Sequence, residues 1–298
     1  MAKRRPATVH GFLVIDKPAG MTSHDVVGAV RRRFSERRVG HAGTLDPDAT
    51  GVLLVGVGNA TRLLTFLVGH DKRYSAEVVL GVGTSTLDSS GEVTEQIDMS
   101  ATTVDDARRV VLEHLSGPIM QVPPMVSALK VDGRRLHELA REGIEVERKP
   151  RPVTIHRFVV DPGPGPGVLS IDVSCSSGTY VRTLAADLGR LLGGAAHLRH
   201  LRRIESGGFT VDEAAPPDTA TLLPMAEALR GMEQIQVDAA TAALVRNGRV
   251  LDRSHPGAGG GFVGDGPWAV LAADGELLAV YEAFRSDQVK PSVVIPEG

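Results

Sequence analysis

Residues 40–51 of this chain, GHAGTLDPDATG, place an acidic side chain on a glycine-flanked turn directly before the apolar run Val52–Val55. Glycine allows backbone conformations that are closed to other residues, and Pro47 fixes its own φ. The carboxylate of Asp46 is therefore expected to be held in one direction rather than merely exposed. Asp, Gly and Pro are also common in ordinary solvated turns, so this segment alone does not establish a functional site.

The bulk composition is that of a globular protein outside the membrane. The chain has 298 residues, of which 42% are hydrophobic and 23% charged, with a net charge of −3. No apolar run approaches the roughly 20 residues of a membrane span, and the apolar run at 12–15 is too short for a signal peptide. The single cysteine, Cys175, excludes an internal disulfide and a cysteine zinc cluster. We expect a cytoplasmic protein without membrane contact.

Positive charge is segregated along the chain despite the negative total. Residues 1–38 hold nine lysines and arginines against three acids, a local net charge of +6. A second basic group lies at 130–151, and a third comprises Arg199, Arg202 and Arg203. Segregated basic patches on a near-neutral protein suit a polyanion bound to one face. The alternative is that these residues only solvate helix faces.

The hydrophobic pattern predicts an α+β fold. Strands are expected at 11–15, 52–57, 74–82 and 169–175, the last with strict alternation of apolar and polar residues. A capping box at Thr22–Asp25 predicts the start of one helix. Further helices are expected from Thr103 to Gly117 and over 179–192, with Leu191 facing inward. Because no regular βαβ repeat occurs, a central, mostly antiparallel sheet flanked by helices is favoured.

The last 60 or so residues have a different character. A short helix at 238–246 is followed by a glycine-rich loop at 257–266 and by two short strands, joined through Asp274 and Gly275. Asp-Gly between apolar runs is a strong hairpin signal. We predict a large domain at 1–235 and a small β-rich domain at 236–298.

Several further motifs accompany the opening turn. An aromatic or leucine side chain stands beside arginine in KRY (72–74), in SSGTYVR (176–182) and in LRR (201–203). With DKPAG (16–20), GTLDP (43–47), TSTLD (84–88) and the segment 124–130, these motifs resemble the TruB family of pseudouridine synthases. The resemblance covers about residues 10–210, and the ordered set is far more specific than any single motif. The small C-terminal domain occupies the place of the family's PUA domain, which binds RNA.

The resemblance implies a reaction and its catalytic residues. It implies cofactor-free isomerisation of uridine 55, in the T-arm loop of tRNA, to pseudouridine, with the base flipped out of its stack at a cost of a few kcal/mol. Asp46 matches the catalytic carboxylate, and Arg182 matches the cation that keeps it ionised. Tyr74 matches the stacking platform and is a candidate for handling the C5 proton. Covalent attack by Asp46 and stabilisation of an oxocarbenium-like charge both remain open.

The resemblance also implies the substrate contacts. His41 would help to open the RNA loop, Tyr180 would line the base pocket, and Leu201 would face Tyr74 across the base. The full set of expected substrate-binding residues is His41, Lys17, Asp88, Lys130, Tyr180 and Leu201. For Lys17, ordering of the loop that follows it is the alternative role. The basic segment at about 120–151 would clamp the RNA stem through its phosphates; Val126 and His137 stand where relatives usually carry tyrosines.

Two other patterns in the sequence are typical of a different catalytic site or of a metal site. Residues 46–50 match the DxDxT loop of haloacid-dehalogenase-type phosphatases, but that loop follows an apolar strand, whereas here the apolar run comes after it. His197 and His200 have the spacing of metal ligands on a helix. Because no acidic third ligand stands at a suitable spacing, an ordinary helix face is favoured and no metal is expected.

Two other RNA proteins remain as alternatives. A non-catalytic RNA-binding protein on the same scaffold would not need Asp46, Arg182 and Tyr74 together. A guide-RNA-dependent relative delegates RNA binding to partner subunits, whereas the basic segment at 120–151 favours binding by this chain alone. We therefore expect a monomeric enzyme with no guide RNA and no obligatory protein partner.

Overall fold

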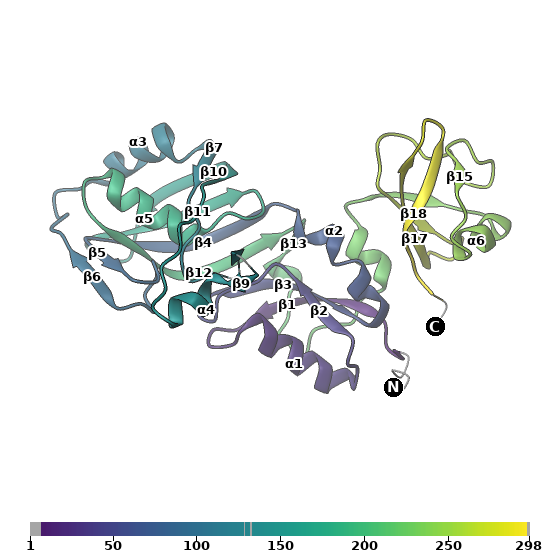
Figure 1. Cartoon of the computed structure of the whole chain (residues 1–298), viewed down its shortest axis with the longest axis horizontal. Coiled ribbons are helices and arrows are strands. Elements are labelled where there is room, and N and C mark those ends of the chain that lie inside the picture. Colours follow the sequence, from purple (N-terminus) through teal and green to yellow (C-terminus); the bar gives the residue numbers. More distant parts are fainter. Residues whose placement is uncertain (1–6, 128, 132, 297–298) are drawn as a thin grey trace.

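A nine-stranded sheet forms the larger part of the molecule (Figure 1). The structure is a computed structural model and describes residues 7–127, 129–131 and 133–296. The strand order is β1-β3-β12-β4-β11-β10-β7, with β2 added to β3 and β13 added to β12. The strands are β1 (Gly11–Lys17), β2 (Val39–Ala42), β3 (Thr50–Val57), β4 (Lys72–Leu80), β7 (Gly117–Gln121), β10 (Arg151–Pro162), β11 (Val168–Cys175), β12 (Ala196–Ser206) and β13 (Phe209–Thr210). All neighbours are antiparallel except β3 and β12. The predicted α+β class is confirmed.

Three longer helices pack on this sheet: α1 (Ser23–Phe34), α3 (Val104–His114) and α5 (Val181–Leu191). Thr22 and Thr103 are the N-caps of α1 and α3, and each forms a complete capping box with the acid three residues later. Helix α5 buries Leu184 and Leu188. Leu191, which was expected to face inward, is 36% exposed, because it lies at the last position of the helix.

The strand β12 corrects the expectation of a helix face around His197 and His200. It lies between β3 and β4, and its pairing with β4 shifts register between Arg199 and Arg202 and again between Arg203 and Glu205. These irregularities break the period-two alternation by which a strand is recognised. They also bring Arg203, predicted as part of a basic patch, into the core with 1% exposure.

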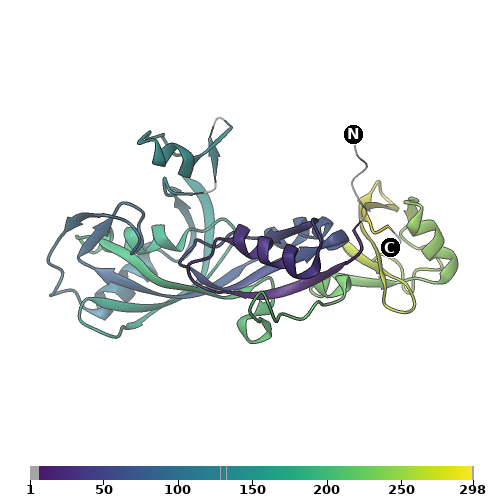
Figure 2. The same cartoon turned by 90° about the horizontal axis from the view of Figure 1, so that it is seen from below.

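The segment between β7 and β10 leaves the sheet. It contains a two-stranded ladder of β8 (Lys130–Val131) with β9 (Arg134–Arg135), followed by α4 (Leu136–Arg141). Figure 2 shows this segment standing away from the sheet on the same side as α1. The shorter elements before β7 are η1 (Gly58–Arg62), α2 (Thr65–Val68), β5 (Val82–Thr84) and β6 (Val93–Gln96).

A second, five-stranded sheet forms the C-terminal module. Its strand order is β14 (Glu233–Gln236), β16 (Trp268–Leu271), β17 (Leu277–Phe284), β18 (Gln288–Val294) and β15 (Leu251–Asp252), and it carries α6 (Ala239–Arg246). The hairpin predicted through Asp274 and Gly275 joins β16 to β17. Two short helices, η2 (Val211–Glu213) and η3 (Met225–Leu229), precede the module. Leu271, Leu277 and Val280 pack in one apolar cluster with residues of the large sheet such as Phe12. Within the described ranges, no helix is long and apolar enough to cross a membrane.

Candidate active site

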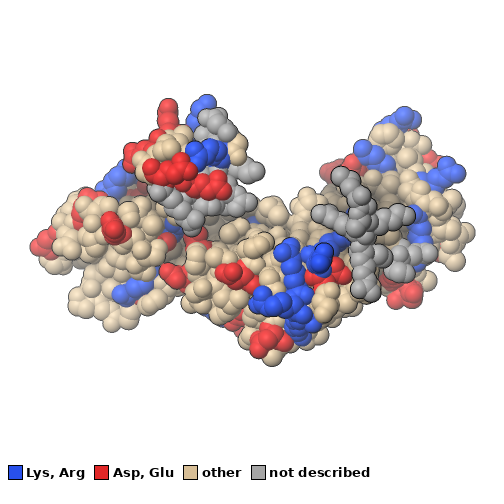
Figure 3. All heavy atoms as spheres, turned by 60° about the horizontal axis from the view of Figure 1, so that its bottom comes forward, with Lys and Arg blue, Asp and Glu red and all other residues tan. Residues whose placement is uncertain are grey.

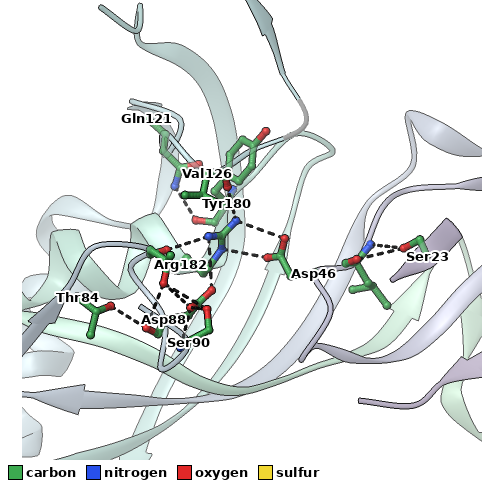
Figure 4. A network of polar contacts seen from close by, with 11 residues as sticks. Ser23, Asp46, Thr84, Asp88, Ser90, Gln121, Val126, Tyr180 and Arg182 are labelled. Atoms are coloured by element: carbon green, nitrogen blue, oxygen red, sulfur yellow. Dashed lines mark hydrogen bonds and ion pairs between the residues drawn. The ribbon is translucent and has the colours of Figure 1, made fainter. Parts of the chain in front are cut away.

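The turn between β2 and β3 carries Asp46, which forms an ion pair with Arg182 in the first turn of α5 (Figure 4). The distance from Arg182 Nε to Asp46 Oδ2 is 3.0 Å, and that from Arg182 Nη2 to Asp46 Oδ1 is 3.4 Å. The Arg182 side chain is 5% exposed, whereas that of Asp46 is 42% exposed. The acid is therefore accessible, while its cation is fixed beneath the surface.

Arg182 is held by three further groups. It donates from Nη1 to the Thr86 carbonyl at 2.8 Å and from Nη2 to the Val126 carbonyl at 2.9 Å. Asp88 Oδ2 lies 3.5 Å from Nη1. The other carboxylate oxygen of Asp88 accepts hydrogen bonds from the Thr86 hydroxyl and from Ser90. Asp88, expected to bind substrate, is thus turned toward Arg182, and two carboxylates share one buried guanidinium.

This environment determines the titration of Asp46. Burial raises the pKa of the Asp46 carboxyl, because the ionised form loses solvation. The Arg182 guanidinium is the main opposing influence and lowers this pKa, while Asp88 raises it further. The ionised state of Asp46 therefore depends on Arg182.

Lys17 lies beneath the turn and is fully buried. Its Nζ donates to the carbonyls of Pro18, Met21 and Pro47 at 2.8, 2.6 and 2.8 Å. Burial lowers the pKa of Lys17 to about 8. Because its exposure is 0% and its donors are used on backbone carbonyls, the geometry favours the loop-ordering role over a substrate contact.

Ser23 and Arg203 also hold the turn, a role that the sequence did not indicate for either residue. The Ser23 hydroxyl donates to the Leu45 carbonyl at 3.1 Å and accepts from the Leu45 amide at 2.9 Å. Arg203 donates to the carbonyls of Gly43 and Val52 at 2.9 and 2.7 Å. Ser23 had been counted only as a capping-box residue, and the irregular pairing of β12 concealed the burial of Arg203. Contacts to backbone carbonyls leave no motif that would reveal them.

The expected base-pocket residues lie around this turn. Tyr74 stands opposite Arg203 in the β4–β12 pairing and packs in the core cluster that includes Leu45, with Leu201 packed against the same cluster. Burial raises the pKa of the Tyr74 hydroxyl, and the neighbouring Arg203 opposes this shift. The Tyr180 backbone is fixed by the Gln121 side chain, with hydrogen bonds of 2.8 and 3.1 Å.

His41 lies on β2, the strand that leads directly into the turn. Burial, reinforced by Arg203, lowers the pKa of its imidazole, so the ring is held neutral near pH 7. Its Nδ1 is buried without a hydrogen-bond partner among the described residues. The side chains of Lys130 and His137 lie outside those that the structure describes.

The basic segments differ in how far acids neutralise them. Arg202 pairs with Asp16, and Arg199 pairs with Glu77, at 2.8 and 2.6 Å. Figure 3 shows lysine and arginine side chains gathered on the face that carries α1, between the segment that projects from the sheet and the C-terminal module. Arg33, at the end of α1, donates to the carbonyls of Pro217 and Ala220. In the described part of the chain it forms no ion pair with a carboxylate.

Comparison with known proteins places this arrangement in a family. The model of the TruB family pseudouridylate synthase N-terminal domain matches residues 31–181, and that of the tRNA pseudouridylate synthase B C-terminal domain matches residues 182–232. A protein of Arthrobacter sp. named tRNA pseudouridine synthase B is 45% identical over 95% of this chain and 96% of its own length. The chain belongs to the TruB family. A second protein of that name, from Symbiobacterium thermophilum, is 52% identical over 80% of this chain and 82% of its own length.

Solved structures share the TruB fold along almost the whole chain. A Cbf5-Nop10-Gar1 complex contains a chain with a TM-score of 0.72 and 25% identity, covering 96% of this chain and 85% of that one. An H/ACA RNP bound to a substrate RNA containing 2′-deoxyuridine gives a TM-score of 0.70 at 24% identity, with the same coverage. Membership of the TruB family of pseudouridylate synthases, shown by the family models and by the relatives of 45% and 52% identity, makes the protein an isomerase.

Proposed function

We propose that this TruB enzyme converts uridine 55 in the T-arm loop of tRNA to pseudouridine, with Asp46 as its catalytic carboxylate. The observation that carries the proposal is the Asp46–Arg182 pair, in which an accessible acid lies 3.0 Å from a buried guanidinium. Relatives named tRNA pseudouridine synthase B that match 95% of this chain support tRNA as the substrate. The enzyme acts as a monomer in the cytoplasm, without a guide RNA or partner subunit.

The isomerisation breaks the bond from C1′ to N1, rotates the uracil and joins C1′ to C5, so that the proton of C5 is lost and N1 regains one. Tyr74 forms the platform for the flipped base, with Leu201 on its other face. Stacking of this kind contributes about 1–3 kcal/mol per base. His41 is neutral and stacks into the space that the base leaves.

Asp46 serves the reaction in its ionised form, either by covalent attack or by stabilising positive charge on the ribose. Arg182 opposes the effect of burial and keeps this form available. Tyr74 is the candidate for handling the C5 proton. Because its pKa is raised, its hydroxyl is protonated near neutral pH and must first pass its proton on before it accepts another.

The remaining surfaces hold the RNA. The basic segment at about 120–151, including Lys130, clamps the stem through phosphate contacts. The C-terminal domain is a PUA-like RNA-binding module. The sequence predicts it at 236–298, and the first strand of the second sheet begins at Glu233.

The test uses an unmodified tRNA transcript without cofactor, with pseudouridine mapped by carbodiimide-dependent primer extension. The wild-type enzyme should modify the T-arm loop, and Asp46→Asn should abolish modification while retaining RNA binding. Asp48→Asn is the matched control, because Asp48 is an exposed acid of the same turn; it should remain active. Modification by Asp46→Asn, or a requirement for a guide RNA, would contradict the proposal.

A further inference from the structure

The turn that carries Asp46 is held from behind at alternate residues. Arg203 of β12 donates to the Gly43 carbonyl at 2.9 Å, Ser23 of α1 to the Leu45 carbonyl at 3.1 Å, and Lys17 of β1 to the Pro47 carbonyl at 2.8 Å. All three donors are buried, with exposures of 1%, 3% and 0%. Donors from three separate elements thus converge on one short stretch of backbone.

The Asp46 side chain itself has little to orient it. In the described part of the chain, its carboxylate is hydrogen-bonded or ion-paired only to Arg182. Figure 4 shows Arg182 and Ser23 on opposite sides of Asp46. The direction of the carboxylate is therefore determined by the backbone that bears it, and that backbone is fixed by the donors behind it.

The Ser23 side chain serves only this turn, whereas Arg203 holds the turn and also interacts with the Tyr74 hydroxyl. The Ser23 hydroxyl is not needed to cap α1, since Thr22 fills that role, and it uses both its donor and its acceptor on Leu45. Arg203 has no carboxylate within ion-pair distance among the described residues, and it bonds the backbone on both sides of the turn, at Gly43 after β2 and at Val52 within β3.

We infer that Ser23 and Arg203 are positioning residues for Asp46, which keep its carboxylate on the Arg182 guanidinium and within reach of the target nucleotide. The inference rests on the proposed role of Asp46. A displacement of about 1 Å at a reacting group can cost on the order of 100-fold in rate. Loss of either donor should therefore reduce the chemical step while leaving RNA binding intact.

The test compares Ser23→Ala with Ser206→Ala by single-turnover rate and RNA dissociation constant. Ser206 is a matched control, because it is 1% exposed and its hydroxyl has no hydrogen-bond partner among the described residues. Ser23→Ala should lower the rate by about 10- to 100-fold and leave the dissociation constant within about twofold. Ser206→Ala should leave both within about twofold.

Arg203→Lys and Arg203→Met test the second residue. Lysine retains the charge and one carbonyl contact, so it should restore part of the rate lost in Arg203→Met. Because Arg203 also neighbours the Tyr74 hydroxyl, and because Arg203→Met could fail to fold, the comparison of Ser23→Ala with Ser206→Ala is the deciding test of the inference.

A double-mutant cycle separates positioning from general destabilisation. In an Arg182→Lys background the ion pair is already altered. Ser23→Ala should therefore lower the rate by a smaller factor in this background than in the wild type. Equal losses in both backgrounds, a Ser23→Ala rate within twofold of wild type, or an equal loss in Ser206→Ala would overturn the inference. If the wild type modified an RNA other than the T-arm loop, the proposed substrate would be wrong, and the same cycle on that RNA would still test the positioning role.

Discussion

Arg182 Nε lies 3.0 Å from Asp46 Oδ2 in an ion pair whose two partners differ eightfold in accessibility, at 5% for the arginine side chain and 42% for the aspartate. A buried guanidinium is costly unless its donors are used, and the carbonyls of Thr86 and Val126, together with the Asp88 carboxylate, supply the remaining acceptors. The cation is therefore rigid before substrate arrives. The acid keeps one side open to solvent.

The pH dependence of the rate should report on this pair. Because burial raises the pKa of Asp46 above its ordinary value of 3.8, acidification should protonate it, and abolish activity, at a higher pH than for an exposed aspartate. Arg182→Met removes the main influence that lowers this pKa, so the acidic limb of the pH–rate profile should move to still higher pH. Single-turnover rates from about pH 4 to about pH 8 measure this. Arg190→Met, on the exposed face of α5, should leave the limb in place, and an unshifted limb in Arg182→Met would refute the assignment.

The same raised pKa predicts a stability effect of opposite sign to the activity effect. A carboxyl whose pKa is raised on folding destabilises the folded state at any pH above that pKa, and the penalty disappears on acidification. Asp46→Asn should therefore be inactive yet unfold at a slightly higher temperature than wild type near pH 7. Thermal unfolding at pH 7 and at about pH 4 tests this, since the difference should shrink at the lower pH. A less stable Asp46→Asn at pH 7 would show that the ion pair outweighs burial.

Lys17 should give the fold a pH dependence on the alkaline side. Its folded pKa is about 8, against 10.5 for the free side chain, so the unfolded state binds more protons between these values. Stability from this group is lowest below pH 8 and rises toward pH 10.5. The free energy of unfolding of wild type relative to Lys17→Met should therefore increase over this window. Urea unfolding at about pH 8 and about pH 10 measures it, and a constant difference would mean that Lys17 titrates normally.

Gly51 should tolerate no side chain. Its φ is +102°, and a Cβ there would lie 2.1 Å from the Arg203 carbonyl oxygen where β3 meets β12. Gly51→Ala should lower the free energy of unfolding by more than about 2 kcal/mol, because left-handed strain adds to the clash. Gly165→Ala is the control, since open space surrounds its Cβ position. Equal urea midpoints for the two variants would contradict the close approach of the strands.

Local signals predicted many of the elements. The capping boxes at Thr22 and Thr103 and the alternation from Leu169 to Cys175 depend on neighbours in sequence, and each element formed where it was expected. The segment that forms β12 was expected to present a helix face because His197 and His200 have helical spacing, while the register shifts of the strand and the positive φ of His200 remove the alternation. A bulge depends on how β12 pairs with β4, and the local sequence of β12 carries no information about that partner strand.

The sequence by itself determined the chemistry available at the turn: a glycine-flanked segment that carries the Asp46 carboxylate, and Arg182, which the resemblance to the family assigned to it as its cation. Only the tertiary structure decided that Arg182 is buried while Asp46 is only partly buried, and that Lys17, Ser23 and Arg203 hold the turn from behind. The reason is that burial and contacts to backbone carbonyls arise where distant segments pack. Asp46 and Arg182 are 136 positions apart along the chain, so their distance is set by how α5 docks against the sheet.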